Sequence, residues 1–120
     1  MRGIIFCKNY TSANTEGVEM LKHIIQQYEK IEVNCIFHIS PSGNSSYADF
    51  YNGDSWRVVV ADRSGTCGRR CNIAYVERSI DYKTYCCLIS PCLYDFPYSA
   101  VRLWGEGNLH INDTPDLPFR

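Results

Sequence analysis

The loop DRSGTCGRRC at residues 62–71 has the residue types best suited to binding chemistry, with three arginines and two glycines. The planar guanidinium group of arginine can make two parallel hydrogen bonds to a phosphate, and glycine lets a backbone approach a ligand closely. Between residues 55 and 80 there are five arginines and only two carboxylates. We therefore expect a phosphate or nucleic-acid site at four residues of this loop: Arg63, Gly68, Arg69 and Arg70. The alternative is a solvated loop whose arginines form weak ion pairs with Asp62 and Glu77.

Seven cysteines raise the possibilities of a zinc site and of a cysteine nucleophile. Cys67 and Cys71 have an acceptable spacing for a first pair of zinc ligands, but the remaining ligands would have to come from a predicted helix, where adjacent side chains point apart. The cysteines concerned are Cys86, Cys87 and Cys92. Because free cysteine is among the most buried residue types, we expect these thiols to fill the core, with no metal and no other cofactor. A cysteine nucleophile would also need a base beside it, and nothing in the sequence places a histidine near a given thiol.

Aromatic residues gather toward the C-terminus, between two prolines and the end of the last predicted strand. The group consists of Tyr94, Phe96, Tyr98 and Trp104. Exposed rings would form a patch for a protein partner, whereas buried rings would close the core, and the sequence favours neither.

Short apolar runs and one helical stripe predict the first elements that position these residues. We expect a buried strand at residues 3–7, then a helix capped by Thr11 or Ser12, then a strand at residues 31–39 beside the first one. The helix has an apolar stripe at helical spacing: Val18, Leu21, Ile24, Ile25 and Tyr28.

The pair Asn52-Gly53 predicts a hairpin between strands at about residues 46–51 and 55–61, with a type I′ turn that needs two positive φ angles. Hydrophobic periodicity on both sides of the pair supports this prediction. The hairpin would deliver the chain directly into the arginine-rich loop.

Beyond that loop, NIAYVE predicts a core strand, and SAVRLWG predicts the last strand. Between them we expect a helix that is capped by Ser79 and ended by Pro91. Its apolar face would consist of Tyr82, Tyr85, Cys86 and Ile89. The order of elements predicts an α/β domain over residues 1–110, with a small, mostly parallel sheet, an inserted β-hairpin and two main helices, followed by a tail at residues 111–120.

Composition restricts the class of protein further. A chain of 120 residues with 45% hydrophobic content fits one domain, and 12 basic residues against 13 acidic ones produce no global field toward nucleic acid or membrane. No apolar run approaches the roughly 18 residues that a membrane span needs. The odd number of cysteines and the opening MRGIIFCKNY, which is unlike a signal peptide, lead us to expect a reduced, cytoplasmic protein.

Two stretches resemble the ATPase domain of phage terminase large subunits, the motors that package viral DNA. They are IIFCKNYTSANTEGVEMLKHII and FYNGDSWRVVVADRSGTCGRRCNIAYVE, the second followed by a predicted helix, a proline and a strand. The resemblance covers roughly residues 3–105. It implies a partial core of the P-loop ATPase type, a viral origin, a place in the cytoplasm of the host cell and a part in DNA packaging.

The departures from that family argue against catalysis. No Gly-Lys-Ser/Thr sequence occurs, so the loop that cradles phosphates and magnesium is missing. Where the family has an aspartate followed by a catalytic glutamate, this chain has Glu77 followed by Arg78, which cannot act as a base. Glu77 is therefore at most a degenerate metal or acid position.

We accordingly expect a non-catalytic phage protein that binds nucleic acid, a phosphate-bearing nucleotide or a protein partner, in an oligomeric state that the sequence leaves open. The alternative is a phage accessory protein that neutralises a host defence factor or sequesters a nucleotide signal.

Overall fold

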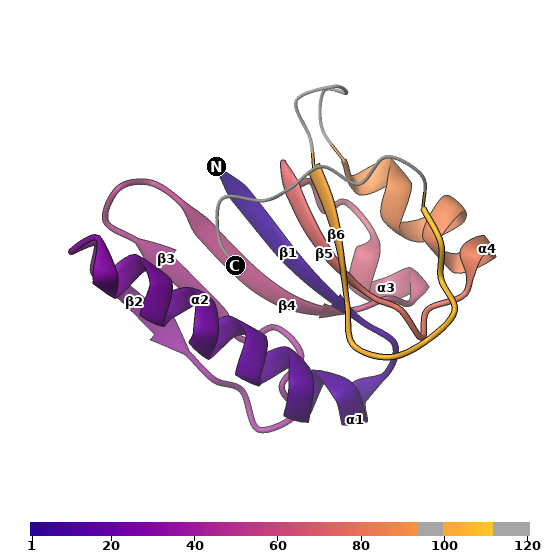
Figure 1. The fold of residues 1–120 in the computed structure, drawn as a ribbon, viewed down its shortest axis with the longest axis horizontal. Coiled ribbons are helices and arrows are strands. Elements are labelled where there is room, and N and C mark those ends of the chain that lie inside the picture. The colour runs from indigo at the N-terminus through magenta and orange to yellow at the C-terminus, as the bar shows by residue number, and fades with distance from the viewer. Residues whose placement is uncertain (94–99, 112–120) are drawn as a thin grey trace.

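The computed structural model describes residues 1–93 and 100–111, which form a six-stranded sheet with helices on both faces (Figure 1). The strands, in chain order, are β1 (Arg2–Cys7), β2 (Cys35–His38), β3 (Tyr47–Phe50), β4 (Ser55–Val60), β5 (Ile73–Glu77) and β6 (Ala100–Trp104). Their order in the sheet is β2-β3-β4-β1-β5-β6. Strands β4, β1, β5 and β6 are parallel, while β3 is antiparallel to both of its neighbours. The predicted α/β class with a mostly parallel sheet and an inserted hairpin is confirmed.

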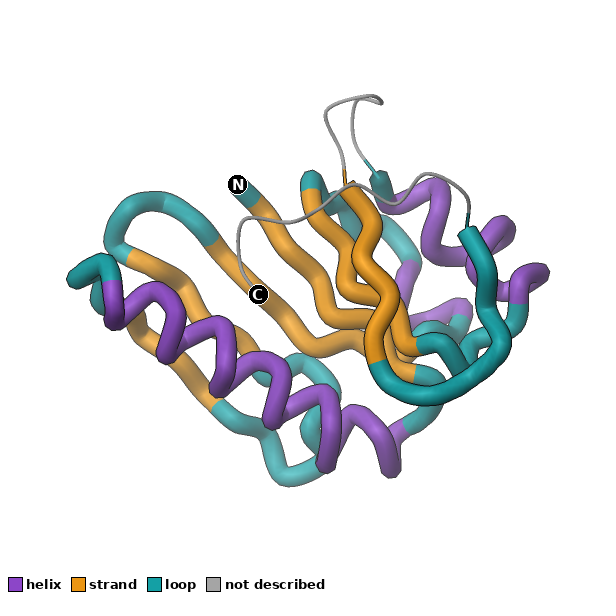
Figure 2. The backbone as a smooth tube through the Cα atoms, viewed as in Figure 1, coloured by secondary structure: helices purple, strands orange, loops and turns teal. Residues whose placement is uncertain are grey.

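The first helical segment lies across one face of the sheet (Figure 2). It consists of α1 (Tyr10–Ser12), a π-helical turn η1 (Ala13–Gly17) and α2 (Val18–Lys30). The predicted apolar stripe of α2 is buried against the sheet, as expected. The predicted cap is wrong, because Asn9 caps the segment and accepts a hydrogen bond from the Ser12 N–H at 2.9 Å. Asn9 follows β1 after only one residue and still has an extended backbone, so the helix begins earlier than Thr11.

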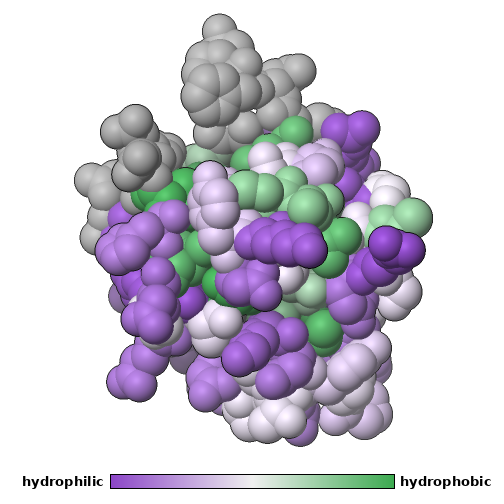
Figure 3. Space-filling model, turned by 90° about the vertical axis from the view of Figure 1, so that its right-hand side faces the viewer, coloured by the Kyte–Doolittle hydropathy of each residue, from purple (hydrophilic) through white to green (hydrophobic). Residues whose placement is uncertain are grey.

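The second helical segment covers part of the opposite face. It consists of α4 (Tyr82–Thr84), a π-helical turn η2 (Tyr85–Ile89) and a 3-10 turn η3 (Ser90–Cys92) that contains Pro91. A shorter helix, α3 (Arg63–Thr66), lies in the arginine-rich loop. The side of the molecule that carries α3 and α4 presents mainly hydrophilic and intermediate side chains, with small apolar areas between them (Figure 3).

Two details of this second segment correct the sequence prediction. Asp81 and not Ser79 is the cap, accepting from the Thr84 N–H at 2.6 Å, because the chain first buries Ile80 and can begin the helix only after it. Of the predicted apolar face, Tyr85 and Ile89 are buried, but Tyr82 and Cys86 are exposed. The π-helical turn has a wider period than the α-helix assumed in the prediction, so these positions do not share one face.

The hydrophobic core has two layers, one on each face of the sheet. Beneath α2, the fully buried Tyr28 and Trp56 pack together with the stripe of the helix. Beneath η2, Phe6 and Ile89 are fully buried with Val59. A sheet that is buried on both faces explains why β1 and the end of β4 read as continuous apolar runs.

Strand β2 corrects the prediction of a strand at 31–39 beside β1. It spans only Cys35–His38, pairs with β3 and forms the edge of the sheet. The place beside β1 is taken by β4, whose run of valines buries both of its faces. Ile36 and Phe37 of β2 are 59% and 56% exposed, so their apolar character did not indicate burial.

The hairpin itself is confirmed, but its turn differs from the type I′ prediction. Only Gly53 has a positive φ, of 97°, and its N–H donates to the Phe50 carbonyl at 3.0 Å. The Phe50 N–H donates in turn to the Asp54 carbonyl at 2.8 Å, which closes a three-residue loop that ends in glycine. Asn52 instead uses its side-chain oxygen to accept from the Asp54 N–H at 3.0 Å.

In the described parts of the chain, no helix has both the length and the apolar character needed to cross a membrane. The predicted tail lies outside those parts from residue 112 on, so the boundary of the domain stays a prediction.

Candidate functional site

The arginine-rich loop begins with a compact, internally bonded turn. Asp62 caps α3 and accepts from the Gly65 N–H at 2.6 Å, while Arg69 Nε donates to the Gly65 carbonyl at 2.7 Å. A side chain at Gly65 would meet the Val60 carbonyl oxygen, so only glycine allows this close approach. The carboxylate of Asp62 is therefore committed to the helix cap and does not neutralise an arginine of the loop.

A recess of about 490 Å³ brings this loop together with three strands, β1, β3 and β4. Gly68, Arg69 and Arg70 line it from the loop. Arg2 contributes from β1 and Arg57 from β4. We call this hollow the arginine recess.

Charge in the arginine recess is strongly one-sided. In the described parts of the chain, four arginines line it against one carboxylate, Asp49 of β3, which amounts to a formal charge of +3 for these side chains. Among the described residues, no salt bridge involves Arg57, Arg69 or Arg70. The ion pairs to Asp62 and Glu77 that the alternative of a solvated loop predicts are therefore absent from residues 1–93 and 100–111, although Arg63, Gly68 and Arg70 are exposed to solvent.

Neutral groups orient Arg57 and Arg70. Arg70 Nη1 donates to the Pro91 carbonyl at 3.2 Å, and the Arg57 guanidinium lies 5.2 Å from the centre of the Tyr47 ring. A guanidinium has five N–H donors, so one bond to a carbonyl leaves most of them for a ligand. Gly68, with φ of 72°, has open space around it, which keeps the mouth of the recess unobstructed at this point.

Arg63, the fourth predicted residue, does not line the arginine recess. It lies in a neighbouring hollow of about 310 Å³, which shares Gly68, Arg69 and Arg70 with the recess. The loop is therefore flanked by two hollows, and three of the four predicted residues belong to both.

Arg57 contributes to the local charge that the sequence shows, but neither Arg57 nor Arg2 was among the predicted site residues. The sequence does indicate the orientation of Arg57. Trp56 and Val58 on either side of it are apolar and must face the helix, so Arg57 must point to the other face of the sheet. Arg2 could not be found in this way, since its place depends on which strand lies beside β1.

Glu77 lies at the far end of the sheet from the arginine recess. It is 6% exposed at the carboxyl end of β5, and its Oε1 accepts from the Lys8 N–H at 3.3 Å. Arg2 and Cys7 stand at opposite ends of β1, about 17 Å apart for a strand of this length, and Lys8 follows Cys7. Glu77 instead lines a separate hollow of about 650 Å³ with Lys8 and Trp104. Within residues 1–93 and 100–111, no group of three or more His, Cys, Asp or Glu side chains could hold a metal ion.

Trp104 is part of the core and not of an exposed patch. It is 9% exposed and packs in the layer beneath α2, where its Nε1 has no hydrogen-bond partner among the described residues. The other predicted members of the aromatic patch, Tyr94, Phe96 and Tyr98, lie outside the described residues.

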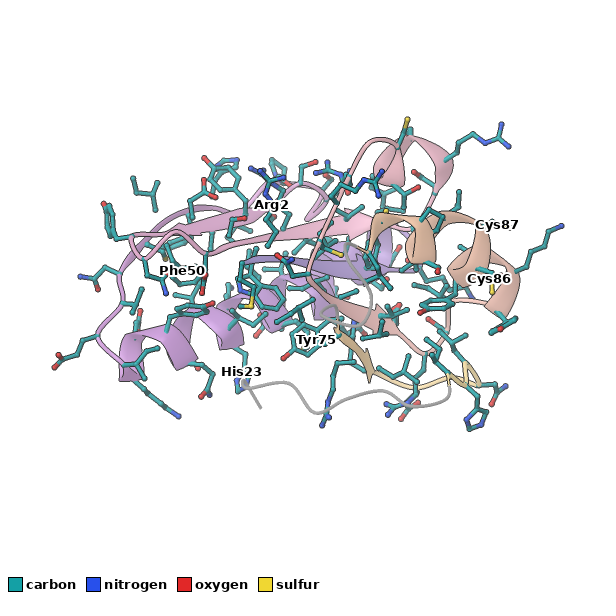
Figure 4. The ribbon with its side chains drawn as sticks, turned by 90° about the horizontal axis from the view of Figure 1, so that it is seen from above. Arg2, His23, Phe50, Tyr75, Cys86 and Cys87 are labelled. Atoms are coloured by element: carbon teal, nitrogen blue, oxygen red, sulfur yellow. The ribbon has the colours of Figure 1, made fainter. Side chains whose placement is uncertain are left out.

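The cysteines only partly follow the expectation of core filling. All seven are free. The buried ones are Cys7, Cys71 and Cys92, Cys35 is half-buried, and the exposed ones are Cys67, Cys86 and Cys87. Burial raises the pKa of the Cys71 thiol to about 12, which keeps it protonated and unreactive at neutral pH. Figure 4 places Cys86 and Cys87 on the second helical segment, away from Arg2.

Comparison of the chain with models of known protein families, with curated proteins and with solved structures finds no match.

Proposed function

We propose that this protein binds a phosphate-bearing ligand, a nucleic acid or a nucleotide, in the arginine recess, and that it acts by binding and not by catalysis. The observation that carries the proposal is the convergence of Arg2, Arg57, Arg69 and Arg70 from three separate segments on one hollow, where the described residues contribute a single carboxylate. Like charges brought together repel one another, so such a cluster is best compensated by an anion.

Phosphate is the anion that suits these groups best. Guanidinium forks match two phosphate oxygens at once, and an always-charged group needs no proton transfer to bind. The chain as a whole has a formal charge of −1, so the attraction is confined to the recess and is not a property of the whole surface.

The proposed lack of catalysis rests on the connection from β1 to the first helix. Only Lys8 and Asn9 separate the two elements, and the side chain of Asn9 is already used as the helix cap. Such a short connection does not form the glycine-rich loop that holds phosphates and magnesium in nucleotide hydrolysis. The family resemblance supports one version of this proposal. In that version the protein is a viral, DNA-binding relative of packaging motors that does not hydrolyse nucleotides.

The size of the recess supports a second candidate, the sequestering of a single nucleotide. A volume of about 490 Å³ falls within the range of small-molecule sites, so one nucleotide can fill it without further contacts.

Thermal unfolding in the presence of ligands tests the proposal. The panel consists of ATP with magnesium, cyclic and linear nucleotides, and short single-stranded and duplex DNA. A ligand at 100 times its dissociation constant stabilises the fold by about 2.7 kcal/mol, which is readily measured. We expect Arg69→Ala/Arg70→Ala to reduce the stabilisation strongly. The matched control, Lys22→Ala/Lys30→Ala, removes two exposed charges from α2 and should leave it intact. If no phosphate-bearing ligand stabilises the protein, the proposal is wrong.

A further inference from the structure

The face of the sheet opposite α2 is only partly covered. In Figure 4 the first helical segment lies on one side of the sheet and Arg2 on the other, and the second helical segment covers only one end of the Arg2 side. No helix formed by the described residues covers β2, β3 or the beginning of β4 on that side (Figure 1). We call this region the open face.

Strand register determines which side chains the open face presents. Ala48, Phe50 and Trp56 belong to the core beneath α2, so the alternating residues point to the other side. Pairing aligns Ile36 with Asp49 and His38 with Tyr47 across β2 and β3, and Tyr47 with Arg57 across β3 and β4. The open face therefore presents Ile36, His38, Tyr47, Asp49, Ser55 and Arg57.

Three of these side chains form a row that leads into the arginine recess. The His38 ring lies 6.1 Å from the Tyr47 ring, and the Arg57 guanidinium lies 5.2 Å from it on the next strand. Arg57 itself lines the recess. Ile36, which is 59% exposed, adds an apolar surface at the outer end of the same face.

We propose that the open face and the arginine recess together hold a single-stranded nucleic acid, with backbone phosphates in the recess and bases against Tyr47, His38 and Ile36. The inference rests on the proposed function and specifies its ligand. The charge of the recess is complementary to phosphates, while planar and apolar groups beside it are complementary to unpaired bases. A duplex would hide the faces of its bases and could not use this row.

The dimensions of the site favour a short oligonucleotide over a single nucleotide. From β2 to β1 the site crosses three strand spacings, about 14 Å in all. One nucleotide in the recess leaves Tyr47 and the groups beyond it unused. Affinity should therefore rise with the number of linked nucleotides until the row is filled.

The test measures the affinity of oligothymidylates from one to eight nucleotides, by calorimetry for the shortest and by fluorescence anisotropy for the others. For the natural sequence we expect affinity to increase over the first few nucleotides and then level off. Tyr47→Ala should weaken an eight-nucleotide strand by about 5- to 150-fold, the loss typical for one stacked base, and should weaken thymidine monophosphate by a smaller factor, because the monophosphate loses only the support that the ring gives to Arg57. Tyr47→Phe, which keeps the ring, should bind like the natural sequence.

A second variant tests the open face at an exposed position, where a substitution does not disturb the fold. Ile36 is largely exposed, so Ile36→Asp leaves the core intact while placing a negative charge beside the expected path of the strand. It should weaken the eight-nucleotide strand but not the monophosphate.

The outcomes separate this inference from the proposed function. If the monophosphate binds through Arg69 and Arg70 but chain length, Tyr47→Ala and Ile36→Asp have no effect, the inference is wrong and the recess is a nucleotide site. Equal affinity for duplex and single strand would overturn the inference as well. If no phosphate-bearing ligand binds, both the inference and the proposed function are wrong.

Discussion

The dependence of binding on salt is the prediction that the structure makes most quantitatively. If each of the four arginines in the recess neutralises one phosphate of a single strand, the logarithm of affinity should fall with the logarithm of salt concentration with a slope of about −2.8. Between 50 and 200 mM salt this slope corresponds to an affinity loss of about 50-fold.

Removing two of the four charges should halve that dependence. For Arg69→Ala/Arg70→Ala we expect a slope of about −1.4 and an affinity loss of only about 7-fold over the same range. The two proteins should therefore differ most at low salt and converge as salt is added. Anisotropy titrations of a labelled oligothymidylate at four or five salt concentrations would measure both slopes.

The control for this experiment is Lys22→Ala/Lys30→Ala, which removes the same charge from exposed positions on the opposite side of the sheet. Its slope should equal that of the natural sequence. If the arginine variant kept the full slope, or if the lysine variant lost as much of it, the positive charge of the recess would not be what binds the phosphates.

Three further predictions concern neighbouring residues. Asp49→Asn removes the one carboxylate that the described residues contribute to the recess, so it should tighten oligonucleotide binding severalfold at low salt, and weaker binding would show that Asp49 contacts the ligand favourably. Burial acts to raise the pKa of Asp54, but hydrogen bonds, first of all the one from Tyr28 Oη at 2.6 Å, outweigh it and leave the pKa below its ordinary value. Asp54→Asn should therefore lower the free energy of unfolding, measured with urea at about pH 7, by about 1–3 kcal/mol. The difference between the variant and the natural sequence should disappear as pH falls through the lowered pKa of Asp54. An equal difference at about pH 7 and at about pH 2 would contradict this prediction. Gly3→Ala would drive a methyl group into the fully buried ring of Trp56, so thermal unfolding should show a loss of about 1–3 kcal/mol, and an unchanged melting temperature would mean that the ring can move aside.

Periodicity predicted the elements of the fold because it is a local property. The stripe of α2 and the valine run of β4 each indicate one kind of burial without reference to any other segment. The caps were predicted less well, since several polar residues compete near each helix start. Asn9 is the cap of the first segment because β1 ends shortly before it. Asp81 is the cap of the second segment because it follows the buried Ile80.

The sequence did not predict which distant segments pair with one another in the sheet. The edge position of β2 follows from the hairpin taking the place beside β1, and no feature of residues 31–39 indicates this. The candidate site shows the same limit. Arg69 and Arg70 could be found as a cluster in one loop, whereas Arg2 joins them only because β1 lies between β4 and β5.

The most direct test of the central claim is a nuclear magnetic resonance titration of the isotopically labelled protein with a short oligothymidylate. The arginine recess and the hollow at Glu77 lie at opposite ends of β1, so amide shifts distinguish them clearly. We predict that the amides of residues 2–4, 55–57 and 68–70 shift with saturation, together with that of Tyr47. Saturable shifts confined to Lys8 and residues 77–79 would place the ligand at the other end of the sheet and contradict the account.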